Sequence, residues 1–149
     1  MKKLTVFLFS FILISTYLWG QEKSLSSKDL AQLDLAEKEM VNALSNGDSA
    51  AFKKIAGNEY IDINANGTKM TLKAMLIDLP NYKGLSVNFS EQLQRVYGTF
   101  VLRTGRAKLY SGGQEMGEVY YTQGWVYRNN RWLFVHWQGT MTKDFLQKK

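Results

Sequence analysis

Asp62 is the residue whose type and setting in this sequence best suit proton-transfer chemistry. It interrupts an otherwise apolar run at 60–63, Tyr-Ile-Asp-Ile, which alternates as a strand does. If Asp62 faces the interior together with Tyr60, the loss of water raises the pKa of its carboxyl group and makes it a general base. The alternatives are a side chain on the solvent face, or one that accepts a hydrogen bond from the turn near Asn66.

His136, the single histidine, is a second candidate for acid–base chemistry. An imidazole titrates near neutral pH, so His136 would form an acid–base pair with Asp62 if both side chains reach one cavity. The alternative is a structural histidine that is hydrogen-bonded on a sheet face. Its strand is expected to place it in register with Trp132, Phe134 and Gln138, although one β-bulge would reverse which residues face inward.

Arg103 and Tyr121 are candidates for ligand binding. An inward Arg103 would select a carboxylate or phosphate ligand, whereas an outward one would be a solvated or interface charge. In a later predicted strand, Tyr121 and Gln123 would face one side of the sheet, and Tyr120 and Thr122 would face the other. Only one of these two pairs can dominate an interior pocket.

The composition excludes several classes of site. The chain has 149 residues, one histidine, no cysteine and a formal net charge of +6. These counts exclude disulfides, thiolate metal sites, a thiol nucleophile and a multi-histidine metal centre. The sequence has no phosphate-binding glycine loop and no serine nucleophile elbow, so we expect no metal and no other cofactor. It also lacks an aromatic–basic motif for RNA, and we expect no nucleic-acid partner.

Residues 1–20 are predicted to be a signal peptide. Lys2 and Lys3 precede an uncharged, mostly apolar segment that is shorter than a bilayer span of about 20 residues and ends at the small Gly20. We therefore expect export to the periplasm or the medium, without a lipid-modified cysteine and without membrane contact after cleavage. The alternative is an uncleaved N-terminal anchor. Residues 21–27 are expected to form a flexible leader.

Three helices are predicted before the main sheet. Ser27 caps the first, which starts at residue 28 and runs to Asn46-Gly47 with apolar residues at three- and four-residue steps. Asp48 caps a shorter second helix. A strand at 59–64 and a turn at Asn66-Gly67 follow. The third helix covers 72–79, with Thr71 as its cap and Pro80 as its end.

From Leu85 onward, apolar residues recur at every second position, which predicts four consecutive strands. Short turns between them favour an antiparallel meander, and residues 143–149 are expected to be a frayed tail. The predicted class is α+β, with three helices on one face of a strongly curved, mainly antiparallel sheet. The first strand should place Leu85, Val87, Phe89 and Leu93 on one face; the others cover about 99–110, with Gly105 as a possible bulge, 118–128 and 131–142.

Several segments resemble a known family in order and spacing. They are 35–64 with Asn46-Gly47-Asp48, then Val-Tyr-Gly at 96–98, Thr-Gly-Arg at 104–106, Gly-Trp-Val-Tyr at 124–127 and Arg-Trp-Leu-Phe-Val at 131–135. This set resembles nuclear-transport-factor-2-like (NTF2-like) domains, in the branch called domain of unknown function 4440, related to SnoaL-like proteins. The resemblance covers about residues 30–142, and the domain is expected to span 28–142.

The resemblance implies a cone-shaped fold in which a bent sheet wraps a long helix and leaves a pocket at its open end. Similar domains include ketosteroid isomerases, dehydratases and polyketide cyclases as well as non-catalytic modules, so the fold alone does not identify a reaction. In similar isomerases an Asp base works with a Tyr donor, which would assign catalysis here to Asp62 with Tyr60 or His136. The expected pocket residues are Tyr60, Asp62, Arg103, Tyr121, His136 and Gln138.

Three functions follow as expectations. The first is an exported protein that binds a small, partly apolar molecule in a cavity of about several hundred Å3. The second is a cofactor-free isomerase, dehydratase or cyclase. The third is an interaction module that forms a homodimer through the outer sheet face, with Trp125 and Tyr127 exposed on it. Trp125, Trp132 and Phe134 either line the pocket or are packing or dimer-interface residues.

Overall fold

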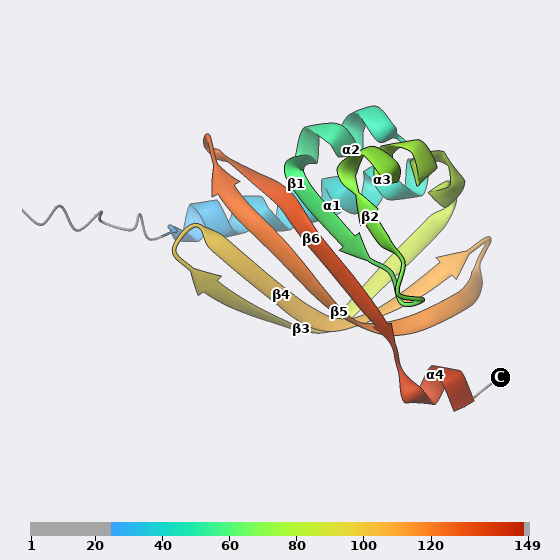
Figure 1. Ribbon diagram of the computed structural model, residues 1–149. Helices are drawn as coiled ribbons and strands as arrows, with labels where there is room; N and C mark the ends of the chain where they lie inside the picture. The colour runs from blue at the N-terminus through green and yellow to red at the C-terminus, as the bar shows by residue number, and fades with distance from the viewer. Residues whose placement is uncertain (1–24, 148–149) are drawn as a thin grey trace, which may run out of the picture.

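The computed structural model describes residues 25–147, in which the first three α-helices lie against one side of a curved six-stranded sheet and the last follows its final strand (Figure 1). This arrangement confirms the predicted α+β class. The strand order is β2-β1-β6-β5-β4-β3. The elements are α1 (Ser27–Asn46), α2 (Ser49–Ile55), β1 (Ala56–Ile63), β2 (Lys69–Thr71), α3 (Leu72–Asp78), the 3-10 helix η1 (Leu79–Tyr82), β3 (Leu85–Tyr97), β4 (Phe100–Ser111), β5 (Gln114–Arg128), β6 (Arg131–Met141) and α4 (Lys143–Gln147).

The helix ends follow local capping chemistry. Ser26, one residue before the predicted cap, forms a capping box with Asp29: the Ser26 hydroxyl accepts from the Asp29 amide at 3.2 Å, and the Asp29 carboxylate accepts from the Ser26 amide at 2.9 Å. Gly47 ends α1 in the left-handed region, with φ of 66°. Asp48 and Thr71 cap α2 and α3 as predicted.

The sheet contains the predicted meander and two further pairings. Strands β3 to β6 are consecutive and antiparallel. Strand β1 pairs in parallel with β6 on one side and antiparallel with the short, unpredicted β2 on the other. Beyond α3, Pro80 lies in the first turn of η1, because a proline that cannot continue an α-helix is tolerated where no amide donor is needed.

Two β-bulges change which residues face the helices. In β3 the register shifts between Ser90 and Leu93, and in β6 it shifts between Phe134 and His136. Leu93 therefore faces away from Phe89 and is 59% exposed, which corrects the expectation that they share a face. Gly105 carries no bulge itself but lies beside the one in β3, where a Cβ would come within 2.7 Å of the Ser90 carbonyl oxygen.

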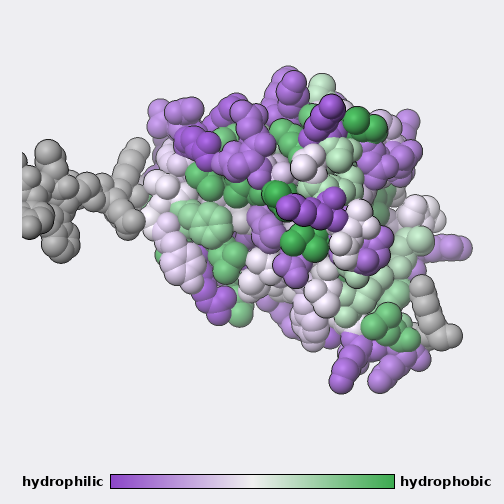
Figure 2. Space-filling model, viewed as in Figure 1, coloured by the Kyte–Doolittle hydropathy of each residue, from purple (hydrophilic) through white to green (hydrophobic). Residues whose placement is uncertain are grey.

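The core lies between α1 and the concave side of the sheet. Trp125 is fully buried there, with its ring centroid 4.7 Å from that of Phe134, and Trp132 is also buried. Tyr127 contacts Trp132 at 5.2 Å between ring centroids. The expectation that Trp125 and Tyr127 lie on the outer face is therefore wrong, because alternate residues of β5 face opposite sides of the sheet and these two face the helices. In the space-filling view, hydrophilic residues cover much of the helical side, with smaller apolar groups between them (Figure 2).

The C-terminal segment forms a short helix, whereas the predicted N-terminal segments are not described. The predicted signal peptide and leader residues 21–24 lie outside the described residues. At the other end, the expected frayed tail contains α4, whose Phe145 amide donates to the Thr142 hydroxyl at 3.3 Å. Within residues 25–147, none of the helices combines the length and apolar character needed to span a bilayer.

Gly105→Ala is expected to lower the free energy of unfolding by about 1–3 kcal/mol, because the added Cβ meets rigid backbone at the bulge. Gly117→Ala is the matched control in the neighbouring strand, since its Cβ would meet only the flexible end of Met141 at 3.2 Å. Urea denaturation measures both variants. Equal losses in the two would contradict the proposed steric role of Gly105.

Candidate functional site

A cavity of about 100 Å3 lies between α1, β1, the ends of β3 and β4, β6 and η1. Most of its lining is apolar. It is smaller than the several hundred Å3 expected, because large side chains from α1 and α3 reach into it. The apolar lining includes Met40, Val41, Leu44, Met75, Val87, Phe89, Phe134 and Trp137.

The polar side chains of this cavity come mainly from β1 and the residue that follows it. Tyr60, Asp62 and Asn64 alternate along the chain and all line it, together with Tyr82 from η1. Tyr60 is 3% exposed and Asp62 is 4% exposed. The interaction of the Tyr60 hydroxyl with the Asp62 carboxylate acts to lower the pKa of Asp62, and the Asn64 side chain likewise acts to lower the pKa of Tyr82. The Asn64 amide also donates to the Met70 sulfur at 3.3 Å. The Oδ1 atom of Asp62 is buried without a hydrogen-bond partner among the described residues.

Burial raises the pKa of Asp62 to about 6, and the hydrogen bond from Tyr60 opposes that rise. The pKa of Tyr60 lies well above its ordinary value, mainly through burial and also through the nearby Asp62 charge. Near neutral pH the site therefore holds a carboxyl group that can exchange a proton beside a phenol that keeps its own.

His136 and Gln138 lie outside this cavity, which corrects their place in the expected pocket. The bulge before His136 pairs it with Ile61 and pairs Trp137 with Asp62, so Trp137 takes the inward position. His136 is half-buried, and burial lowers its pKa while a hydrogen bond to the Ile61 backbone raises it. The acid–base pair of Asp62 with His136 is not formed.

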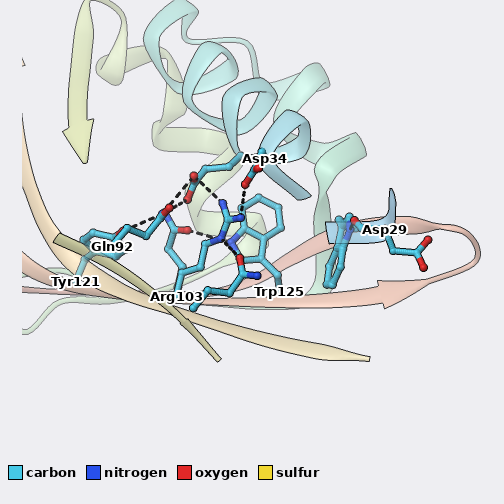
Figure 3. A network of polar contacts seen from close by, with 10 residues as sticks. Asp29, Asp34, Gln92, Arg103, Tyr121 and Trp125 are labelled. Carbon is cyan, nitrogen blue, oxygen red and sulfur yellow. Dashed lines mark hydrogen bonds and ion pairs between the residues drawn. The ribbon is translucent and has the colours of Figure 1, made fainter. Parts of the chain in front are cut away.

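Arg103 faces inward but belongs to a second polar cluster, shown in Figure 3. It forms ion pairs with Asp34 and with Glu37 of α1, the latter at 2.8 Å, and its Nε donates to Gln94 at 2.9 Å. Arg103 is 2% exposed, so these contacts take the place of hydrogen bonds from its guanidinium to water. Arg103 thus links α1 to the sheet by ion pairs and does not line the cavity.

Tyr121 belongs to the same cluster. Its hydroxyl accepts from Gln92 Nε2 at 3.0 Å, and Gln92 also donates to Glu37 at 3.1 Å (Figure 3). Tyr121 and Gln123 face inward, and Gln123 accepts from the Trp125 indole at 3.0 Å. Tyr121 stacks on Trp137 with 5.3 Å between ring centroids, so it supports the cavity wall from behind.

Of the described lining residues, sequence reasoning named only Tyr60 and Asp62 as expected pocket residues; among those it missed, Asn64, Tyr82 and Trp137 carry polar groups. Asn64 continues the alternation of Tyr60 and Asp62, so the strand period contained a signal for it. Tyr82 depends on the turn after Pro80 and Trp137 depends on the β6 bulge, neither of which the period reveals. Within residues 25–147, no group of three or more His, Asp or Glu side chains is placed to hold a metal ion.

Comparison with known proteins identifies the fold. No family model and no curated protein matches the chain. An NTF2-like protein from Cytophaga hutchinsonii is 15% identical with a TM-score of 0.65, over 79% of this chain and 100% of that one. An NTF2-like protein of unknown function from Pseudomonas putida is 12% identical with a TM-score of 0.67, over 85% and 95%.

A putative Ca/calmodulin-dependent kinase II association domain from Exiguobacterium sibiricum is 17% identical, with a TM-score of 0.67 over 80% of this chain and 97% of that one. Other similar structures are described as having a cystatin-like fold. The expected NTF2-like fold is therefore confirmed. Membership of the domain of unknown function 4440 branch stays a prediction.

The raised pKa of Asp62 predicts that the contribution of this residue to the free energy of unfolding falls as the pH rises from about 4 to 7. The proton is held more tightly in the folded state, so the stabilisation is complete below the unfolded pKa and is lost through the folded pKa of about 6. Its full size is about 3 kcal/mol. Urea denaturation across this pH range should show the slope in the wild type, and Asp62→Asn should reduce it. The exposed Glu115→Gln should keep it, and equal slopes in wild type and Asp62→Asn would contradict the assignment.

Arg103→Met is expected to cost about 3–5 kcal/mol of stability, because Glu37 and the Gln94 amide oxygen lose their buried partner. Arg128→Met is the control: Arg128 pairs with Glu59 at the surface, and its loss should cost about 1 kcal/mol or less. Both values come from urea unfolding at pH 7. Similar costs for the two variants would show that the buried cluster does not stabilise the fold.

Proposed function

We propose that this protein binds a small, largely apolar molecule in the cavity, with the Asp62 carboxylate as the polar anchor. The observation that carries the proposal is the buried Oδ1 of Asp62, which has no hydrogen-bond partner among residues 25–147 and lies in an otherwise mostly apolar lining. A buried polar atom without a hydrogen bond costs about 1–3 kcal/mol. A ligand that donates to Oδ1 would recover this cost and bury its apolar part against the lining.

The cavity limits the size of the ligand. Pockets for drug-sized molecules measure about 300–1,000 Å3, whereas this one measures about 100 Å3. The proposed ligand is therefore a compact molecule, or one compact group of a larger molecule. Export to the periplasm or the medium remains part of the proposal, on the basis of the sequence of residues 1–20.

Cofactor-free acid–base catalysis is a second candidate, favoured by a carboxyl group with a pKa of about 6 in the cavity. Of the two expected donors, His136 lies elsewhere and Tyr60 directs its hydroxyl at Asp62. A substrate would instead have to lie between Asp62 and Tyr82. An isomerase or dehydratase reaction would then use Asp62 to remove a proton and Tyr82 to stabilise the developing charge.

The homodimer through the outer sheet face also remains a proposal. It is supported by large apolar side chains that β3 and β5 present on that face: Leu93 and Tyr97 are 59% and 58% exposed, and Tyr120 is 54% exposed. Such a dimer is compatible with ligand binding, because the cavity opens on the helical side of the sheet.

Thermal-shift measurements with phenol, cyclohexanol and cyclohexylamine test ligand binding. At a concentration tenfold above the dissociation constant, a ligand stabilises the folded state by about 1.4 kcal/mol, which raises the melting temperature by several degrees. Val87→Phe fills the cavity and should abolish the shift, whereas Val126→Phe, on a strand position outside the lining, should retain it. No shift with any of the probes, or an unchanged shift in Val87→Phe, would refute the proposal.

A further inference from the structure

We propose that the cavity selects an organic cation, namely a compact protonated amine or quaternary ammonium group held beside Asp62 and enclosed by aromatic rings. This inference rests on the proposed function and specifies the class of its ligand. It depends on two properties of the lining that are independent of each other: its charge and its ring content.

The charge of the lining is unbalanced. Asp62 is its only carboxylate, and none of the described lining residues is a lysine, arginine or histidine. Arg103 lies outside the lining and forms ion pairs with Asp34 and Glu37. The hydrogen bond from Tyr60 serves the carboxylate, but Oδ1 is left without a partner. An ionised buried carboxylate needs a countercharge as well as a hydrogen bond, and a cationic ligand supplies the charge that a neutral donor cannot.

Aromatic rings form a large part of the wall. Five lining residues are aromatic, and they come from four elements: β1, η1, β3 and β6. The Tyr60 and Phe134 ring centroids are 5.3 Å apart, and those of Phe89 and Trp137 are 6.4 Å apart, so the rings gather in two neighbouring pairs. The negative faces of aromatic rings attract ammonium groups, most strongly where water is excluded. The five residues are Tyr60, Tyr82, Phe89, Phe134 and Trp137.

The remaining features fit a compact cation with apolar substituents. A volume of about 100 Å3 admits a group such as trimethylammonium, and excludes a polycyclic molecule. Met40, Leu44 and Met75 offer apolar contact to its methyl groups. A strongly hydrated metal cation is a poor match, because the lining offers one carboxylate and few other oxygen ligands.

The experiment compares choline with 3,3-dimethyl-1-butanol, its neutral isostere, by calorimetric titration of the full-length protein at pH 7.5. The two compounds differ in the charged nitrogen, so shape and apolar area are matched. Choline should bind at least about tenfold more tightly than the isostere. Asp62→Asn should remove this preference, and Asp144→Asn, which changes an exposed carboxylate on α4, should keep it.

The pH dependence in the wild type gives a second readout that needs no variant. Choline binding should weaken between pH 7.5 and 5 as Asp62 takes up a proton, while binding of the isostere stays constant. The other titratable groups of the lining are Tyr60 and Tyr82, both of which remain protonated over this range because burial raises their pKa. The faces of α1, α3, β3, β4 and β6 that line the cavity contribute no ionisable group.

The failures of the two proposals are distinguishable. Equal affinity for choline and the isostere, with both lost in Val87→Phe, would overturn the cation preference and leave ligand binding standing. Binding of phenol or cyclohexanol without binding of choline would do the same. If none of these compounds binds, both the cation preference and the proposed function fall.

Discussion

The ion pairs of the buried Arg103 with Glu37, which is largely buried, and with Asp34, which is mostly exposed, link α1 to the sheet, and the cavity depends on the position of α1. The two acidic residues lie about one to three turns before Met40 and Leu44, which line the cavity. An ion pair of this kind specifies one alignment of the helix because displacement along the sheet would leave charges buried without partners. Apolar packing alone tolerates small shifts, whereas this contact does not.

The regular part of β1 explains why the acidic centre of the site was predictable from sequence. Asp62 stands out because it breaks an apolar strand, and Ile61 to Ile63 pair with β6 in unbroken register. His136 and Gln138 were misplaced because the β6 bulge lies one residue earlier and has no marker in the sequence. Arg103 was expected to face inward as one alternative, but its ion-pair partners lie more than 60 residues away in the chain. Strand period and capping residues thus predict elements, whereas bulges and distant partners decide which side chains meet.

The site combines a group that weakens the fold with a surrounding structure that tolerates it. Asp62 is more costly to bury than the apolar residue that would suit its strand position, and its unpartnered oxygen adds to that cost. Natural cores retain such a group where it serves binding or chemistry, since a hydrophobic replacement would stabilise the protein. The dense packing of Trp125, Phe134 and Phe52 nearby provides apolar burial that offsets the loss.

The parallel pairing of β1 with β6 also has a consequence for the order of folding. It joins Ile61 to His136, so two walls of the cavity come from segments separated by most of the domain. Closing so long a loop is entropically unfavourable until the intervening meander has formed, so we expect this contact to form late in folding. During synthesis, a nascent chain that still lacks its last strand has β1 without its main neighbour. The cavity therefore cannot be complete before β6, which supplies Phe134 and Trp137 to its wall, has been synthesised.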